Sequence, residues 1–353
     1  MHYVTAKRMI GEKKSLNARL LVGILLMSLA TTASAAAADA AFGGSKLVKA
    51  AEKEGKLVLY TANQLASEQD MVAAFNKRFP GIKVAIVRAP GSRLATRIET
   101  EVAAHKLTAD VIDMSDRGLV SSFQKVFADY APPNANLYPE KTKALKNLWP
   151  KTSWGFVIAY NSASGVEAPA SWKDLAKPEY KGKVGIVVAN SGGSTWTRAM
   201  FERQELGKDY WVKLAANKPV LYPSGAPAAS GIVRGEVLVG GVQSNAVIPQ
   251  IKKGAPLKVV YPAEGIPVTA SAAGVVKTAA HPNAARLYMN WCLSKEGQSV
   301  WVEQGGGFSV LKGAPLPQGA SPSTKLWIPD SKEYISLRTQ WIRDWNKIFN
   351  YEQ

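Results

Sequence analysis

Residues 184–200 read VGIVVANSGGSTWTRAM, and this stretch decides the fold. An apolar run stops at a loop of Asn, Ser and Gly, and apolar residues resume at Trp196, Met200 and Phe201 with the spacing of a helix. The pattern predicts a strand, a glycine loop and a helix start. Glycine lets a ligand approach the backbone, and the first N–H groups of a helix lack partners, so the loop suits an anion. The alternative interpretation is an ordinary helix cap, because Ser and Thr are common there.

The N-terminus has the pattern of a secretory signal peptide, which we place at residues 1–38. Five Lys or Arg residues precede an apolar run at 20–30 and a small-residue tract that contains Ala33-Ser34-Ala35. The apolar run is too short for a good membrane span. We therefore expect cleavage and a periplasmic protein, with a retained N-terminal anchor as the alternative.

Length, cysteine content and charge limit the possible folds and partners of the remaining chain. Its 315 residues are enough for two lobes, and the single cysteine, Cys292, excludes an internal disulfide. The whole chain has a formal net charge of +17, but its Lys and Arg residues are scattered. In an exported chain this favours attraction of small anions over nucleic-acid binding, with plain surface solvation as the alternative.

The first half of the chain alternates between strand and helix patterns. Strand-like runs at 57–61, 82–87 and 109–114 are separated by helical spacing, which predicts an α/β fold with a parallel sheet. Ligands of such sheets bind beyond the carboxyl ends of the strands. The candidate binding residues at or just beyond those ends are Asn63, Gln64, Arg93, Ser115, Asp116 and Arg117.

The second half repeats this style. We expect strands at 154–160, 184–188, 237–242, 259–261 and 268–276, then a helix capped by Asn283. An arginine at the cleft can grip an oxyanion with two N–H groups, whereas an acidic residue there can hold an ammonium. The candidate binding residues of this half are Ser191, Gly192, Gly193, Ser194, Thr195, Tyr222, Gln243, Ser244, Asn245 and Glu264.

Several segments, taken in order, resemble the extracellular solute-binding proteins that serve ABC importers. They are KLVLYTANQ at 56–64, the stretch 168–195 that ends in NSGGST, SGIVRGEVLVGGVQSNA at 230–246, KKGAPLKVVYPAEG at 252–265 and HPNAARLYMNWCLSKEGQ at 281–298. The branch they resemble includes ferric-iron, thiamine, phosphonate and sugar-phosphate binders. The resemblance covers nearly the whole mature chain. In this branch, the loop matching Ser191-Gly192-Gly193 often holds an oxyanion at a helix start.

The resemblance implies a two-lobed type II periplasmic-binding-protein fold. Each lobe is expected to be a mixed sheet flanked by helices, with the ligand cleft between the lobes, closure on the ligand, and docking to a membrane permease. We assign 39–153 to lobe 1, 154–267 to lobe 2, 268–312 to a return to lobe 1, and 313–353 to a C-terminal helical extension packed on the lobes. In that extension, Trp341, Trp345 and Phe349 recur every four residues and predict one buried helix face, with permease contact as the alternative.

Two other functions stay open. Ferric binders of this branch have adjacent tyrosines near the segment 241–245, where this chain has none, and Fe³⁺ prefers anionic oxygen ligands. Only Tyr222, Tyr261 and Asp116 could assemble a metal site, so we expect no metal and no cofactor. A secreted hydrolase is weaker still, because the usual catalytic motifs are missing and Asp110 and Asp113 fall on opposite faces of a strand.

These arguments converge on a binding protein rather than an enzyme. We expect a monomer that captures a small anionic or zwitterionic solute, such as a phosphonate, phosphate ester or carboxylate, and delivers it to the permease of an ABC importer. Ferric-iron binding is the alternative.

Overall fold

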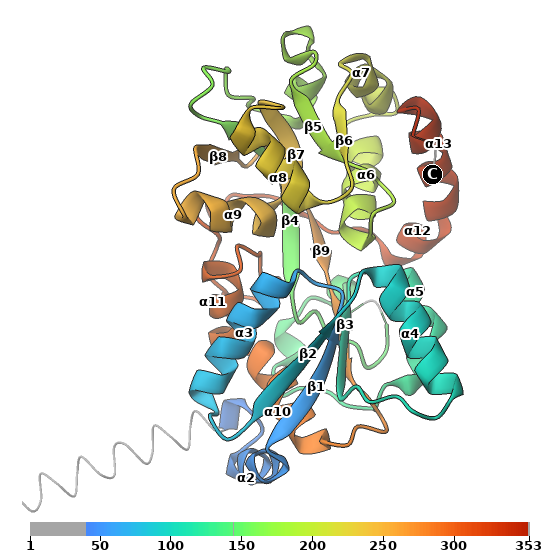
Figure 1. The fold of residues 1–353 in the computed structure, drawn as a ribbon, viewed down its shortest axis with the longest axis vertical. Helices are drawn as coiled ribbons and strands as arrows, with labels where there is room; N and C mark the ends of the chain where they lie inside the picture. Colours follow the sequence, from blue (N-terminus) through green and yellow to red (C-terminus); the bar gives the residue numbers. More distant parts are fainter. Residues whose placement is uncertain (1–39, 144, 352–353) are drawn as a thin grey trace, which may run out of the picture.

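The alternating pattern of the first half folds as a twisted sheet with helices on both sides. The computed structural model describes residues 40–143 and 145–351, and its lower lobe holds four strands in the order β10-β3-β1-β2 (Figure 1). Strands β1, β2 and β3 run parallel, whereas β10 runs antiparallel to β3. The elements of this lobe, lobe 1, are α2 (Ser45–Glu54), β1 (Lys56–Thr61), α3 (Leu65–Arg78), β2 (Lys83–Arg88), α4 (Gly91–Ala103), β3 (Val111–Met114), α5 (Arg117–Ser122), β10 (Ala272–Val275), α10 (Pro282–Cys292) and α11 (Lys295–Glu303).

The upper lobe, lobe 2, is built around a mixed seven-stranded sheet. Its strand order is β11-β9-β4-β7-β5-β6, and β8 pairs with β4. The elements of lobe 2 are β4 (Ser153–Asn161), β5 (Val184–Val187), α6 (Gly193–Glu205), α7 (Tyr210–Ala216), β6 (Val220–Tyr222), α8 (Gly225–Arg234), β7 (Val239–Gln243), α9 (Ser244–Lys252), β8 (Leu257–Val260), β9 (Ile266–Ala270), β11 (Leu326–Trp327), α12 (Ser331–Ser336) and α13 (Arg338–Ile348). Short 3-10 helices lie in the connections, at Gln124–Val126, Ala135–Leu137, Glu140–Thr142, Trp172–Ala176 and Pro178–Tyr180.

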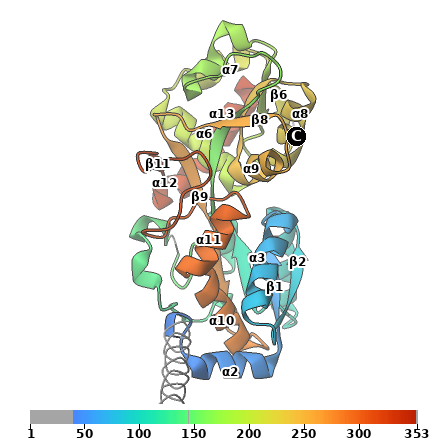
Figure 2. The same cartoon turned by 90° about the vertical axis from the view of Figure 1, so that its left-hand side faces the viewer.

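Two antiparallel segments join the lobes side by side. Strand β4 pairs with β9, and below that pair the Ser271 amide donates to the Thr152 carbonyl at 2.8 Å (Figures 1 and 2). The single strand that we expected at 268–276 is therefore wrong, because the chain changes sheets at Ser271. Our lobe boundary at 268 falls inside β9, and lobe 1 resumes only at β10. A continuous apolar run does not reveal which sheet each half will pair with.

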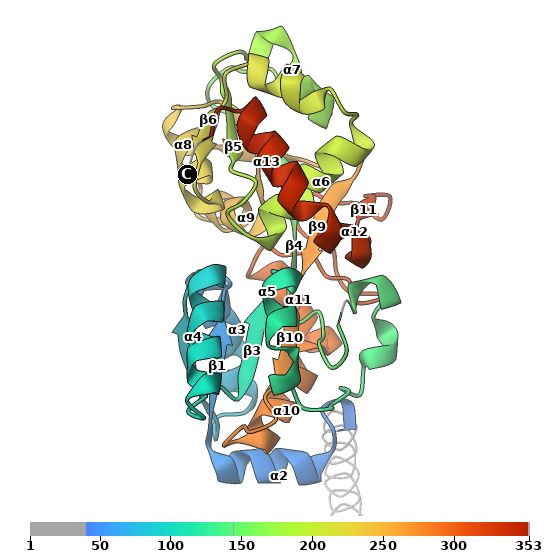
Figure 3. The same ribbon diagram turned by 90° about the vertical axis from the view of Figure 1, so that its right-hand side faces the viewer.

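The C-terminal helices α12 and α13 lie on lobe 2, with α12 above α5 at the level where the lobes meet (Figure 3). The predicted aromatic face is confirmed as a packing face. Trp345 is fully buried and stacks on Phe349 with ring centroids 4.3 Å apart. Trp341 meets the edges of Trp196 and Trp211. Aromatic burial therefore anchors the extension to lobe 2.

The predicted start of α10 is wrong by two positions. Pro282 opens α10, and the Asn283 side chain donates to the Glu54 carboxylate at 2.6 Å instead of capping the helix. The predicted signal peptide lies outside the described residues. Within those residues, no helix combines the length and the apolar character that a membrane crossing requires.

Cys292 lies in the core of lobe 1, as expected for a structural cysteine. It is fully buried, and burial raises the pKa of its thiol to about 12. The reactive thiolate is therefore scarce at neutral pH.

Candidate functional site

A cavity of about 440 Å³ lies between the lobes, where strand ends meet helix starts. Its walls include residues from six junctions: β1 to α3, β2 to α4, β3 to α5, β5 to α6, β6 to α8, and β7 to α9. The first turn of a helix has N–H groups without intrahelical partners and carries a partial positive charge, although at α5 the Asp116 carboxylate accepts from two of these amides. The other five helix starts have no carboxylate cap, and around one cavity they create a field that favours an anion.

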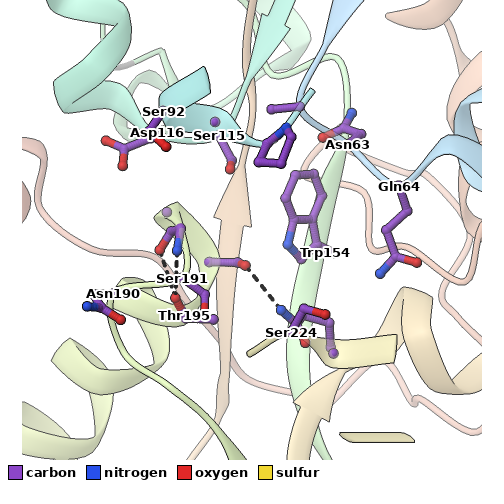
Figure 4. A pocket seen from close by; sticks show the side chains of 18 of the residues that line it. Asn63, Gln64, Ser92, Ser115, Asp116, Trp154, Asn190, Ser191, Thr195 and Ser224 are labelled. Carbon is purple, nitrogen blue, oxygen red and sulfur yellow. Dashed lines mark hydrogen bonds between the residues drawn. The ribbon is translucent and has the colours of Figure 1, made fainter. Parts of the chain in front are cut away.

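The structure brings together most of the residues that the sequence placed at strand ends. The predicted residues that line the cavity are Asn63, Gln64, Ser115, Asp116, Ser191, Gly192, Gly193, Ser194, Thr195, Gln243 and Asn245 (Figure 4). Their roles in binding a ligand remain predictions.

Two predicted arginines lie away from the cavity. Arg93 is exposed on α4, because that helix already begins at Gly91. Arg117 is only 4% exposed and donates from Nη1 to the Ser331 hydroxyl at 2.9 Å. Burial lowers the pKa of the Arg117 guanidinium. Arg117 therefore joins α5 to the C-terminal extension and does not line the cavity.

Three predicted residues of lobe 2 also fall outside the cavity wall. The Tyr222 hydroxyl donates to Glu236 at 3.2 Å, and Tyr222 does not line the cavity. Ser244 is fully buried in the first turn of α9. Glu264 sits in the turn between β8 and β9. All three residues lie at or near strand ends, but none of them lines the cavity.

The glycine loop forms one wall, and two of its hydroxyls hold the loop itself. Ser191 donates to the Pro223 carbonyl at 2.7 Å, and the Thr195 hydroxyl contacts the carbonyls of Ala189 and Gly192 at 2.9 Å (Figure 4). The Ser194 hydroxyl has a single weak contact, at 3.5 Å from Gln243 Nε2. Ser194 is therefore the loop hydroxyl with donor capacity left for a ligand.

Gly193 lies close to lobe 1. A Cβ atom at this position would lie 2.5 Å from the Ser115 carbonyl oxygen, across the cleft, and 2.9 Å from the Tyr334 hydroxyl. At neighbouring Gly192, a Cβ would meet nothing within 4 Å. Close approach of the lobes therefore requires glycine at 193 but not at 192.

Arg88 supplies a cation that the sequence prediction missed. It ends β2, lines the cavity, and donates from Nε to the Asn63 carbonyl at 3.1 Å. Among the described residues it has no carboxylate partner within ion-pair distance. We had expected the strand to end at Val87 and had placed the cleft arginine at Arg93. The sequence signal was the position of Arg88 immediately before the Ala89-Pro90-Gly91 loop.

The sequence did not predict several other residues of the cavity wall. Arg338 comes from the C-terminal extension, far along the chain from every predicted strand end. Trp154 stands in the crossing strand β4. The further lining residues that were missed are Ala62, Leu119, Pro223, Ser224 and Gly225, whereas Pro90, Gly91, Ser92 and Asn190 belong to loops that we expected at strand ends.

A buried ion network lies behind the lobe-1 wall. The Lys151 ammonium contacts Glu68 at 2.9 Å and Asp113 at 2.8 Å, and all three side chains are fully buried. Burial would lower the pKa of Lys151, but the Asp113 and Glu68 carboxylates raise it well above its usual value. The network therefore keeps its ammonium charged, which the two buried carboxylates require.

This network fixes the orientation of Asn63. The Asn63 Nδ2 donates to Glu68 at 2.6 Å and to Asp113 at 2.9 Å, and ionised carboxylates only accept hydrogen bonds. The amide oxygen must therefore occupy the opposite side. Oδ1 of Asn63 has no partner among the described residues, and the same holds for Oε1 of Gln243 and Oδ1 of Asn245. These wall residues offer acceptors for the hydroxyl or ammonium groups of a solute.

The residues considered for a metal site do not gather in the cavity. Asp116 alone lines it, and its carboxylate pairs with Arg338 at 2.8 Å. The Tyr261 hydroxyl donates to the Gln318 carbonyl at 2.7 Å. Within 40–143 and 145–351, no group of three or more His, Cys, Asp or Glu side chains could hold a metal ion.

The acidic residues considered for a hydrolase serve the fold. Asp110 accepts from the Val58 amide at 2.7 Å and lies 2.9 Å from His281 Nδ1. Asp113 belongs to the buried network around Lys151. Neither carboxylate lines the cavity.

Comparison with known proteins gives the family. The chain belongs to the bacterial extracellular solute-binding proteins, whose sequence model matches residues 60–299. The Fe(3+)-binding periplasmic protein of Serratia marcescens is 23% identical, over 83% of this chain and 92% of that protein. A putative 2-aminoethylphosphonate-binding periplasmic protein of Salmonella typhimurium is 25% identical, over 78% of this chain and 81% of that protein.

Solved structures agree with the fold. The periplasmic binding protein AfuA from Actinobacillus pleuropneumoniae, with exogenous fructose-6-phosphate bound, superimposes with a TM-score of 0.68. It is 24% identical in sequence, and the match covers 84% of this chain and 99% of that chain. The two-lobed type II fold expected from the sequence is therefore confirmed, and so is the family resemblance.

Proposed function

We propose that this protein is the periplasmic solute-binding component of an ABC importer, and that it captures a small organic solute bearing an oxyanion. The observation that carries this proposal is the set of five helix starts without a carboxylate cap, with Arg88, around one interlobe cavity. A phosphonate, phosphate ester or carboxylate accepts hydrogen bonds from both kinds of group. Names of related proteins, a phosphonate binder and a sugar-phosphate complex, support the same solute class.

The proposed mechanism is closure around the solute. The open protein offers the donors of one lobe, and the solute then bridges both walls as the lobes approach. A ligand favours closure only through contacts that it gains in the closed state. Ser194 and the first amides of α6 would hold the oxyanion from lobe 2, while Arg88 would reach it from lobe 1.

The rest of the solute is expected to carry hydrogen-bond donors. The unpartnered amide oxygens of Asn63, Gln243 and Asn245 belong to residues that are more than nine-tenths buried and line the cavity. An unsatisfied buried acceptor costs about 1–3 kcal/mol, so a solute that supplies a hydroxyl or ammonium is favoured. Zwitterionic and hydroxylated oxyanions fit this requirement.

Ferric iron is the second candidate, because one relative is named as an Fe(3+)-binding protein. The cavity wall argues against it. The described lining residues include no tyrosine or histidine, and their one carboxylate, Asp116, is held by Arg338. Hard Fe³⁺ prefers anionic oxygen ligands, which this wall does not offer.

Native mass spectrometry of protein purified from its own host tests the proposal. We expect monomeric protein with a bound organic mass that contains a phosphonate, phosphate or carboxylate group. A bound mass that corresponds to iron, together with a visible absorption band after addition of ferric citrate, would establish the second candidate instead. A bound neutral solute would contradict both.

A further inference from the structure

The C-terminal extension reaches the binding cavity from outside the part of the chain that the family match covers. That match ends at residue 299, whereas α12 and α13 begin at Ser331 and Arg338. The extension is held to lobe 2 near the glycine loop. Trp196 Nε1 donates to the Tyr334 carbonyl at 2.8 Å, and the Tyr334 hydroxyl donates to the Gly193 carbonyl at 3.0 Å.

From this base on lobe 2, two hydrogen-bonded side-chain pairs join the extension to lobe 1. Arg338 Nη2 lies 2.8 Å from Asp116 Oδ2, and Nη1 donates to Oδ1 at 3.2 Å. Arg117 in return donates to Ser331 at 2.9 Å. The Asp116 carboxylate also accepts from the Gly118 and Leu119 amides at the start of α5. Asp116 therefore has a fixed position, and it fixes the guanidinium of Arg338 in turn.

The guanidinium of Arg338 retains donor capacity in this position. A guanidinium has five N–H donors, and the pairing with Asp116 uses two of them. Nε is buried and has no hydrogen-bond partner among the described residues. The side chain is 26% exposed and lines the same cavity as Arg88 and Ser194.

We propose that Arg338 is a solute-contacting residue that helps to select the oxyanion, and that Asp116 positions it from across the cleft. This inference rests on the proposed function and deepens it. The remaining N–H donors of Arg338 bind the oxyanion when the lobes close, so the C-terminal extension completes the binding site. Asp116 acts through Arg338 and does not itself bind the anion.

Calorimetric titration of Arg338→Gln tests this role with fructose 6-phosphate and 2-aminoethylphosphonate as probes. The affinity for a probe that the wild type binds should fall by about tenfold to a hundredfold, because a charge-assisted hydrogen bond is lost. The matched control is Arg343→Gln, an exposed arginine on the same helix, which should stay within about twofold of wild type. Thermal unfolding of both variants checks that α13 remains packed.

A double-mutant cycle tests the positioning role of Asp116. Asp116→Asn should weaken binding in the wild-type background and should have little further effect in the Arg338→Gln background. Equal effects in the two backgrounds would overturn the positioning role.

The outcomes separate this inference from the proposed function. If the wild type binds a probe and Arg338→Gln binds it equally well, only the role of Arg338 is overturned. If native mass spectrometry finds iron or a neutral solute in the wild type, the proposed function fails and this inference falls with it.

Discussion

The two walls of the cavity follow the same topology but present different chemistry. In both lobes, three strand-to-helix junctions face the cavity. The lobe-1 wall carries charged side chains, Arg88 and Asp116, with a buried ion network behind them. The lobe-2 strand-to-helix junctions offer neutral groups: backbone amides, hydroxyls and carboxamides. The lobe-1 wall therefore offers a ligand side-chain charges that neighbouring residues hold in place. The lobe-2 wall instead offers neutral groups whose positions are fixed by the helix starts.

The first test of this contrast removes the buried ammonium of Lys151 behind the lobe-1 wall. Lys151→Met leaves Glu68 and Asp113 buried without their cation, which should cost about 3–5 kcal/mol of unfolding free energy. Denaturant unfolding measures the change. The control is Lys208→Met, because Lys208 is exposed on lobe 2 and its change should stay within about 0.5 kcal/mol. Equal stability of the two variants would show that the network does not support the wall.

The second test concerns the fixed backbone of the lobe-2 wall. Gly193→Ala places a methyl group against the Ser115 carbonyl across the cleft, and overpacking of this kind costs about 1–3 kcal/mol. Affinity measured by calorimetry should fall by roughly fivefold to a hundredfold. Gly192→Ala is the matched control, since its Cβ meets open space. If both alanines bind alike, the lobes do not approach at Gly193 in the bound state.

The third test asks which arginine of lobe 1 serves the cavity. Arg88→Gln should weaken oxyanion binding by about tenfold to a hundredfold, because a guanidinium without a carboxylate partner is lost. Arg93→Gln should change the affinity by less than about twofold, since Arg93 is exposed on α4 outside the wall. If Arg93→Gln weakens binding more than Arg88→Gln does, then Arg93 is the cleft arginine, as the sequence predicted.

The fourth test separates the hydroxyls of the glycine loop and carries the smallest expected effect. Ser194→Ala should weaken binding by about tenfold without loss of stability. Ser191→Ala should instead lower the unfolding free energy by about 0.5–1.5 kcal/mol, because its hydroxyl holds the loop through Pro223. If Ser191→Ala weakens binding and Ser194→Ala lowers the unfolding free energy, the two assignments must be exchanged.

Local patterns predicted the parts of the fold and site that are local in sequence. The strand, glycine loop and helix at 184–200 lie where their periodicity and turn residues placed them. A shift of one residue in a strand end was nevertheless enough to select Arg93 over Arg88. Boundary positions depend on pairing partners that the local sequence does not contain.

The features that were missed depend on distant parts of the chain. Lys151 meets Glu68 across 83 residues, and Arg338 meets Asp116 across 222. No periodicity in either segment predicts such a pair. The change of sheet at Ser271 has the same origin, since both halves of that apolar run suit a buried strand.

Calorimetric titration with two matched solute pairs tests the central claim most directly. Fructose 6-phosphate is compared with fructose, and 2-aminoethylphosphonate with ethanolamine, so that each pair differs in the oxyanion. We expect the oxyanion member of at least one pair to bind about a hundredfold or more tightly than its partner. Equal affinity for the two members of the pair that binds would contradict the account. Binding of ferric citrate without binding of fructose 6-phosphate or 2-aminoethylphosphonate would contradict it as well.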